Sequence, residues 1–138
     1  MLLLDTKVVS ELRKVQLGNA DPHVARWSDT LDTADLFISA ITIHELEIGV
    51  LLAERRDPPR GTLFRQWLER QVVSAFEGRI LPVDAAVARR AAQLHVPDPR
   101  PINDAFIAAT ALVHGMTVAT RNAADFAATG VTLLNPWL

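Results

Sequence analysis

Four acidic residues stand where apolar segments of the chain begin or end, at Asp5, Glu45, Asp104 and Asp125. Carboxylates brought within a few ångströms of one another raise each other's pKa values unless a cation offsets them. The chain has no cysteine, and its histidines show no converging pattern, so the candidate donors are all oxygen atoms. Oxygen donors favour a hard ion such as Mg²⁺ or Mn²⁺. If the four carboxylates meet, they predict a site for a divalent cation.

Each of these acids also has an ordinary structural interpretation. Asp5 can begin a turn after a strand, and Asp125 can cap or turn the chain. Glu45 has the spacing of a capping box with Thr42, and Asp104 can complement the dipole of the helix that it opens. The residue types alone therefore leave the structural and the catalytic interpretations open.

The elements that must position these acids alternate along the chain between short apolar runs and helical patterns. Strands are expected at residues 2–4, 36–38, 79–82, 117–120 and 131–134. Helices are expected at residues 8–14, 41–52, 63–76, 85–94 and 103–114, with another beginning at 21–22. This alternation predicts an α/β fold with a mostly parallel sheet covered on both faces. Ligands of such sheets bind beyond the carboxyl ends of the strands, where all four acids can converge.

The length of 138 residues favours one domain. Hydrophobic residues make up 49% and charged residues 22% of the chain, which excludes a disordered protein. Proline-rich segments at 55–61 and 97–101 are expected to be loops rather than domain linkers. No apolar run approaches the roughly 18 residues of a membrane span, and no basic region opens a signal peptide. We therefore expect a soluble protein of the cytoplasm with no membrane partner.

The net charge of −2 gives no overall signature of nucleic-acid binding. Residues 51–100 nevertheless carry nine bases against six acids, and all nine bases are arginines. The guanidinium fork suits phosphate because it can donate two hydrogen bonds at once. The weaker candidates for phosphate contacts are Arg55, Arg56, Arg60, Arg65 and Arg70. A solvated helix face is the alternative interpretation of the same arginines.

Several segments together resemble a known family. They are LLDT at 3–6 with VVSEL at 8–12, ISAITIHEL at 38–46, GRILP at 78–82, NDAFIAATA at 103–111, HG at 114–115, TRNAADF at 120–126 and NPW at 135–137. They span nearly the whole chain in family order. The sequence resembles PIN-domain proteins, and within them the VapC-type toxins of bacterial toxin–antitoxin pairs, especially the FitB-like branch.

The resemblance implies a single PIN domain over residues 1–138, with a doubly wound, mostly parallel sheet of four to five strands flanked by helices. It also implies a Mg²⁺-dependent endoribonuclease, with Mn²⁺ as a possible substitute. The family's acidic quartet falls on the same four acids, and its supporting residues match Thr6, Thr120 and Asn122.

The resemblance also implies partners. Such toxins typically cleave tRNA or rRNA, form homodimers and are inhibited by a small VapB-type antitoxin that binds operator DNA. Apolar positions on two expected helices are candidates for a groove that takes an antitoxin helix: Leu46, Val50 and Leu51 on one helix, and Leu63, Trp67 and Leu68 on the other. Packing in the core is the alternative fate of these side chains.

One residue departs from the family pattern. After Asp5 and Thr6 the family nearly always has asparagine, whereas this chain has Lys7. A cation in the pocket would compete with the metal, which predicts weakened metal affinity and lower activity. The alternative function is therefore a catalytically weakened PIN scaffold that acts mainly as an antitoxin-binding module. If Lys7 instead extends into solvent, the metal site is unaffected.

Other hydrolytic chemistries fit the sequence less well. His44 and Glu45 resemble the start of a zinc-protease motif, but that motif needs histidine where Ile48 stands. An aspartyl-phosphate phosphatase would need a second aspartate in place of Lys7. No glycine-rich phosphate loop and no Gly-x-Ser-x-Gly segment is present. A phosphohydrolase that acts on small phosphate esters stays open as a second enzymatic alternative.

Overall fold

The computed structural model describes residues 1–138, and its centre is a sheet of five strands, all parallel, in the order β3-β2-β1-β4-β5. The strands are β1 (Leu2–Leu4), β2 (Leu36–Ser39), β3 (Ile80–Leu81), β4 (Thr117–Ala119) and β5 (Leu133–Leu134). These positions confirm the five predicted strands and the parallel sheet. Most of the strands are apolar because a parallel sheet is buried on both faces.

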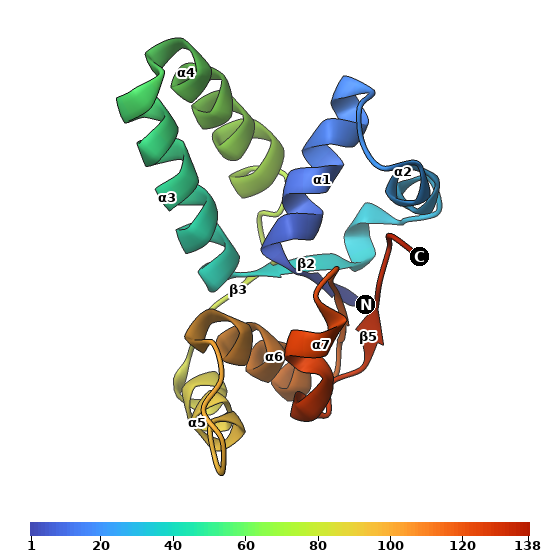
Figure 1. Ribbon diagram of the computed structural model, residues 1–138, viewed down its shortest axis with the longest axis vertical. Coiled ribbons are helices and arrows are strands. Elements are labelled where there is room, and N and C mark those ends of the chain that lie inside the picture. Colours follow the sequence, from blue (N-terminus) through green and yellow to red (C-terminus); the bar gives the residue numbers. More distant parts are fainter.

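Helices cover both faces of the sheet (Figure 1). One face carries α1 (Thr6–Leu17), α2 (Pro22–Ser28), α3 (Ala40–Arg56) and α4 (Pro58–Trp67), with α4 continuing as a π-helical segment, η2 (Leu68–Val73). The other face carries α5 (Ala85–Leu94), α6 (Ile102–His114) and α7 (Ala123–Phe126). Two short 3₁₀ turns, η1 (Thr33–Asp35) and η3 (Ala127–Thr129), precede β2 and follow α7. The fold is therefore the predicted doubly wound α/β arrangement.

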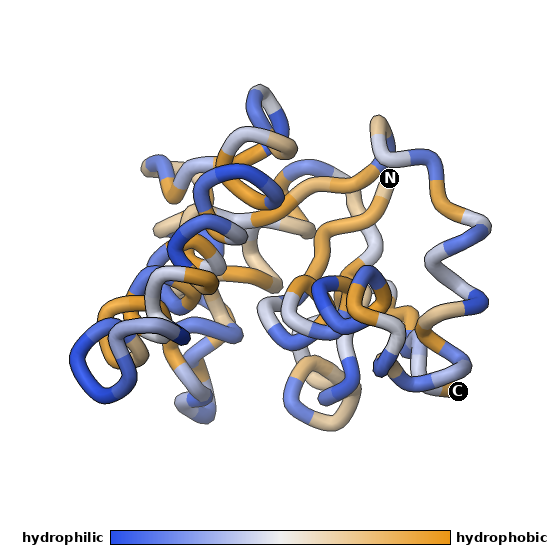
Figure 2. The backbone as a smooth tube through the Cα atoms, turned by 90° about the horizontal axis from the view of Figure 1, so that it is seen from above, coloured by the Kyte–Doolittle hydropathy of each residue, from blue (hydrophilic) through white to orange (hydrophobic).

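Each face of the sheet has its own hydrophobic core because side chains alternate along a strand. Leu3 of β1 and Val118 of β4 are fully buried against the α5–α6 layer. Leu4 and Ala119, their neighbours in sequence, are fully buried against the α1–α3 layer. Figure 2 shows hydrophobic stretches concentrated towards the centre of the molecule and hydrophilic stretches at its outer turns.

The site at which ligands are expected is fixed by the connectivity of the sheet. The chain moves from β1 outward through β2 to β3 and then returns to the other side of β1 for β4 and β5. The register pairs Leu4 with Ala119, so Asp5 and Thr120 follow two adjacent strands at the same edge. This edge between β1 and β4 is the topological switch point, the usual binding crevice of such sheets.

The predicted loop at residues 55–61 is wrong, because α3 and α4 are separated by Asp57 alone. The backbone N–H of Asp57 donates to the carbonyl of Ala53 (2.8 Å), and its side chain accepts from the backbone N–H of Arg60 (3.4 Å). Pro58 and Pro59 occupy the first turn of α4, where proline has no hydrogen bond to lose. The prolines therefore start a helix here instead of interrupting one. The loop at 97–101 is present, between α5 and α6.

Two predicted helix starts also differ from the structure. Ser39, rather than Thr42, caps α3 by accepting a hydrogen bond from the backbone N–H of Ile41 (3.0 Å). α6 begins at Ile102, one residue before its predicted start at residue 103, and Pro101 precedes it. Thr42 is thereby a fully buried residue inside α3, free for a different contact. None of the helices combines the length and the apolar character needed to cross a membrane.

Candidate active site

Asp5 stands at the end of β1 and caps α1, and only 6% of it is exposed. Its Oδ1 accepts a hydrogen bond from the backbone N–H of Thr6 (2.8 Å), and its Oδ2 accepts one from the hydroxyl of Thr120 (2.8 Å). The backbone of Asp5 is extended, and α1 begins with the next residue. The carboxylate therefore lies at the carboxyl end of β1, next to the end of β4. A nearly buried charge of this kind is held in place by the two donors that it needs.

Glu45 lies in α3 and is fixed from α1. The hydroxyl of Thr6 donates to Oε1 of Glu45 (2.9 Å) and lies 3.2 Å from the hydroxyl of Thr42. Neither contact is the capping box considered from the sequence. Thr6 thus places the carboxylate of Glu45 beside that of Asp5, and Oε2 of Glu45 has no hydrogen-bond partner in the protein.

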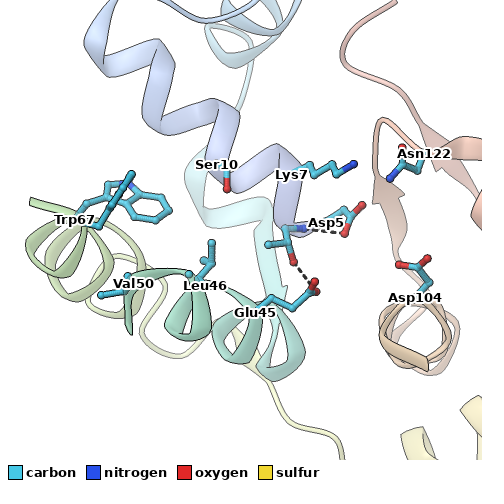
Figure 3. A pocket seen from close by; sticks show the side chains of 12 residues that line it. Asp5, Lys7, Ser10, Glu45, Leu46, Val50, Trp67, Asp104 and Asn122 are labelled. Carbon is cyan, nitrogen blue, oxygen red and sulfur yellow. Dashed lines mark hydrogen bonds between the residues drawn. The ribbon is translucent and has the colours of Figure 1, made fainter. Parts of the chain in front are cut away.

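Asp104 enters the same pocket from the first turn of α6, on the opposite face of the sheet (Figure 3). Its carboxylate forms no hydrogen bond within the protein. Burial first, and then the negative charges of Asp5, Asp125 and Glu45, raise its pKa to about 6, against a smaller lowering by Lys7. Such a shift marks a carboxylate whose surroundings favour a proton or a cation.

The loop after β4 supplies the fourth side of the site. The hydroxyl of Thr120 accepts a hydrogen bond from the backbone N–H of Asn122 (3.0 Å) while it donates to Asp5. The side chain of Asn122 lines the pocket and makes no capping bond to α7. Asp125 is exposed and does not line the pocket, yet its charge still acts on Asp104. Asp125 therefore lies at the rim of the site.

Lys7 is exposed but lines the pocket, and its side chain extends across the opening towards Asn122 (Figure 3). It forms no ion pair within 4.0 Å of a carboxylate, as the salt bridges of the chain all lie elsewhere. Its positive charge still lowers the pKa of Asp104. Lys7 is thus a nearby cation of the acidic pocket without being bound to any one acid.

The acids occupy one end of a cavity of about 430 Å³, and apolar side chains occupy the other. The polar end is lined by Asp5, Thr6, Lys7, Glu45, Asp104 and Asn122. The apolar end is lined by Leu46, Val50, Phe64 and Trp67. Three of the six residues predicted for the groove, Leu46, Val50 and Trp67, line this end. The other three do not: Leu51 and Leu63 are exposed and Leu68 is buried in the core. Sequence analysis missed Phe64, although its position three residues before Trp67 on one helix was a usable signal.

The donor set fits a hydrated hard ion. No three acidic or histidine side chains are grouped closely enough to enclose an ion directly, and Asp104 lies across the pocket from Asp5 and Glu45 (Figure 3). Mg²⁺ usually keeps several waters and binds through one or two carboxylates. Spaced oxygen donors, with Asp104 unengaged, suit that mode better than a closed cage of protein ligands.

The arginines predicted to contact phosphate lie outside this pocket. Arg65 donates from Nη1 to Glu47 (2.8 Å) and from Nη2 to Glu54 (3.1 Å), which joins α4 to α3. The hydrogen bond with Arg65 lowers the pKa of Glu47, and that with Glu47 raises the pKa of Arg65. The other four are exposed, at Arg55, Arg56, Arg60 and Arg70. Arg65 is therefore engaged in holding two helices together.

Comparison with known proteins agrees with this arrangement. The family model of the PIN domain matches residues 2–131, which include every acid of the site. The chain belongs to the PIN-domain family. This PIN domain is 40% identical over 142 residues to VapC ribonuclease Y4jK of Sinorhizobium fredii, a match that covers 99% of this chain and 98% of that protein.

Two further relatives extend the comparison. Toxin FitB of Neisseria gonorrhoeae is 38% identical to this PIN domain over 143 residues, with 99% of each chain covered. A solved structure of FitAB bound to the IR36 DNA fragment has a chain that superposes with a TM-score of 0.88 at 36% identity, covering 100% of this chain and 96% of that one. The predicted resemblance to VapC-type and FitB-like toxins is confirmed.

Proposed function

We propose that this PIN domain is the toxin of a type II, VapBC-type toxin–antitoxin pair and a Mg²⁺-dependent endoribonuclease, with Mn²⁺ as a possible substitute. The observation that carries the proposal is the convergence of Asp5, Glu45 and Asp104 on one pocket at the switch point of the sheet. The names of its relatives, a VapC ribonuclease and a FitB toxin, support the same function.

Asp5 and Asp104 are the residues that would hold the metal, with Glu45 beside them and Asp125 at the rim. A bound divalent cation lowers the pKa of a coordinated water and offsets negative charge on the scissile phosphate. Thr6 and Thr120 keep the carboxylates of Glu45 and Asp5 fixed, so little reorganisation is needed when substrate binds. Asp104 has no hydrogen-bond partner in the protein, so both of its carboxylate oxygens are available to the metal or to the waters that the metal would carry.

The RNA that we propose as substrate is tRNA or rRNA, in line with the family resemblance. We propose that the protein acts as a homodimer and is inhibited by a VapB-type antitoxin, through which alone it would associate with operator DNA. The structure of FitAB bound to a DNA fragment supports an association of such a pair with DNA. The apolar end of the pocket is lined by Leu46, Val50 and Trp67. An apolar side chain of the antitoxin could bind there and displace water from the region next to the acids.

The test is cleavage of structured RNA by the purified protein in Mg²⁺ and in EDTA. We expect the wild type to cleave RNA in Mg²⁺ and not in EDTA. The Asp5→Asn and Asp104→Asn variants should not cleave RNA in either condition. Asparagine caps a helix about as well as aspartate, so Asp5→Asn should stay folded, which circular dichroism checks. Arg89→Gln, on α5 and exposed, is the control that should cleave normally. Cleavage in EDTA, or by Asp5→Asn, would refute the metal-dependent mechanism.

A second candidate function is a weakened scaffold that mainly binds the antitoxin, and the position of Lys7 at the acidic pocket favours it. The same assay separates the two functions. A folded wild-type protein that cuts no RNA in Mg²⁺, while Lys7→Asn does, would support the scaffold. Hydrolysis of p-nitrophenyl phosphate without cleavage of RNA would instead support a small-molecule phosphohydrolase.

A further inference from the structure

A second, smaller cavity of about 230 Å³ adjoins the acidic pocket. Its lining residues are Lys7, Ser10, Glu11, Lys14, Arg121 and Trp137. Lys7 and Ser10 also line the acidic pocket, so these two side chains form the wall between the cavities. We call the second cavity the basic pocket.

The sequence brings these residues together in a simple way. Positions 7, 10, 11 and 14 are spaced three, four and seven residues apart on α1, so they share one face of that helix. Arg121 directly follows Thr120, whose hydroxyl is bonded to Asp5. The basic pocket is therefore built on the same strand edge as the acids.

The basic pocket carries three cations against one acid. Lys14 lies 3.6 Å from Glu11, whose other oxygen accepts a hydrogen bond from the backbone N–H of Asp21 (3.1 Å). Lys7 and Arg121 have no anionic partner within 4.0 Å, as the salt bridges of the chain involve other residues. Neither Lys7 nor Arg121 is thus held in an ion pair, although the charge of Lys7 also acts on Asp104 of the acidic pocket.

Arg121 is also held in place. Its guanidinium carbon lies 5.3 Å from the ring centroid of Trp137, a cation–π contact. The stacking restricts the long side chain while its N–H groups stay available. An arginine fixed in this way is suited to phosphate because its fork binds two oxygens of one group.

The two pockets carry opposite charge: the acidic pocket is lined by carboxylates and the basic pocket mainly by cations. An RNA strand bears a negative charge at every nucleotide, and carboxylates at the acidic pocket repel the phosphate that must enter it. Cations beside that pocket can bind the next phosphate along the strand and so hold the scissile one against the repulsion. We propose that the basic pocket is the binding subsite for a phosphate adjacent to the scissile phosphate of the RNA, a proposal that rests on the ribonuclease function.

The test measures RNA binding and needs no cleavage. The probe is a fluorescent oligoribonucleotide with 2′-O-methyl sugars, titrated with protein in EDTA over a range of salt concentrations. The slope of log K against log salt changes by about 0.7 for each single-strand phosphate contact. We expect Lys7→Gln and Arg121→Gln each to weaken binding and to reduce the slope by about that amount. Arg89→Gln is the matched control, and it should leave both affinity and slope unchanged.

A variant that should bind the oligonucleotide more tightly gives the experiment a second comparison. Glu11→Gln removes the one acid of the basic pocket and keeps an oxygen for the backbone N–H of Asp21. This variant should bind the oligonucleotide more tightly than the wild type. The changed side chains in the other variants are exposed, so these variants should stay folded. Circular dichroism checks this for all four variants.

The outcomes are distinct from those of the cleavage assay. Unchanged slopes in Lys7→Gln and Arg121→Gln, or no RNA binding by the wild type in EDTA, would overturn the subsite even if the protein cleaves RNA. Inorganic pyrophosphate that binds more tightly than the oligonucleotide would show a site for free phosphates instead. Reduced slopes in a protein that fails to cleave RNA would show that the basic pocket binds an RNA phosphate, but would refute the nuclease assignment and, with it, a position next to a scissile phosphate.

Discussion

Thr120 donates a hydrogen bond from its hydroxyl to Oδ2 of Asp5 at 2.8 Å, across 115 positions of the chain. The same hydroxyl accepts from the backbone N–H of Asn122. One fully buried threonine therefore fixes both the carboxylate at the end of β1 and the loop after β4. The candidate site depends on this link because no other side chain donates to that oxygen.

Replacing Thr120 with valine should destabilise the fold. Valine has nearly the same shape but leaves the Asp5 carboxylate and the Asn122 N–H without their partner. A lost hydrogen bond to a charged group costs about 1.5–3 kcal/mol. Urea unfolding at pH 7.5 measures the loss, and Thr120→Ser, which keeps the hydroxyl, is the control. A Thr120→Val protein as stable as the wild type would contradict the importance of the link.

Replacing Asp104 with asparagine should stabilise the metal-free protein at high pH. The pKa of Asp104 is raised from 3.8 to about 6 by burial and by nearby carboxylates. The folded protein therefore holds this proton more tightly than the unfolded chain does, so ionised Asp104 lowers stability. That penalty is absent at pH values below the unfolded pKa and is complete once the pH has risen above the folded one.

Melting temperatures in EDTA measure this effect. The Asp104→Asn protein should melt a few degrees above the wild type at pH 8, and the difference should shrink steadily as the pH falls from 6 towards 4. Asp98→Asn, in the exposed loop before α6, is the control and should show no such trend. A difference that does not depend on pH would rule out the electrostatic cause.

Replacing Lys7 with asparagine should strengthen Mg²⁺ binding. Lys7 lines the acidic pocket, and removal of its positive charge ends its repulsion of the metal. With no ion pair to break, we expect a change of about tenfold, typical of partly screened charges near a surface. Isothermal titration calorimetry measures the affinity, and Lys14→Asn, one pocket away, should change it far less. If the wild type and Lys7→Asn bind Mg²⁺ with equal affinity, Lys7 does not weaken the metal site.

Replacing each of two glycines with alanine should change the stability of the fold in opposite directions. A Cβ at Gly61 would lie 2.4 Å from the Cα of Glu54, so α3 and α4 would have to separate. Such overpacking costs about 1–3 kcal/mol. Gly49, within α3, has nothing within 4 Å of a Cβ, and alanine there should gain about 0.5–1 kcal/mol from helix propensity. Denaturant unfolding checks both, and a stable Gly61→Ala protein would show that the helices can part without cost.

The sequence by itself determined the order of the elements and the presence of the acids at their ends. Apolar runs such as Leu2–Leu4 and the helical pattern of Ala85–Leu94 are local signals, because burial of a strand or of a helix face leaves its period in the chain. The family resemblance added the roles of Asp5 and Asp104. Local signals failed at 55–61, where proline at a helix start and proline in a loop look alike.

Only the tertiary structure decided which side chains meet. Thr6 binds Glu45 instead of solvent, and Asp125 lies at the rim instead of among the pocket residues. Arg65 is taken up by glutamates of α3 and by one of η2, whereas Arg121, which no charge pattern singled out, lines the basic pocket. Such contacts form when helices pack against the twisted sheet. Because the residues that they join are far apart in the chain, no local periodicity in the sequence reveals them.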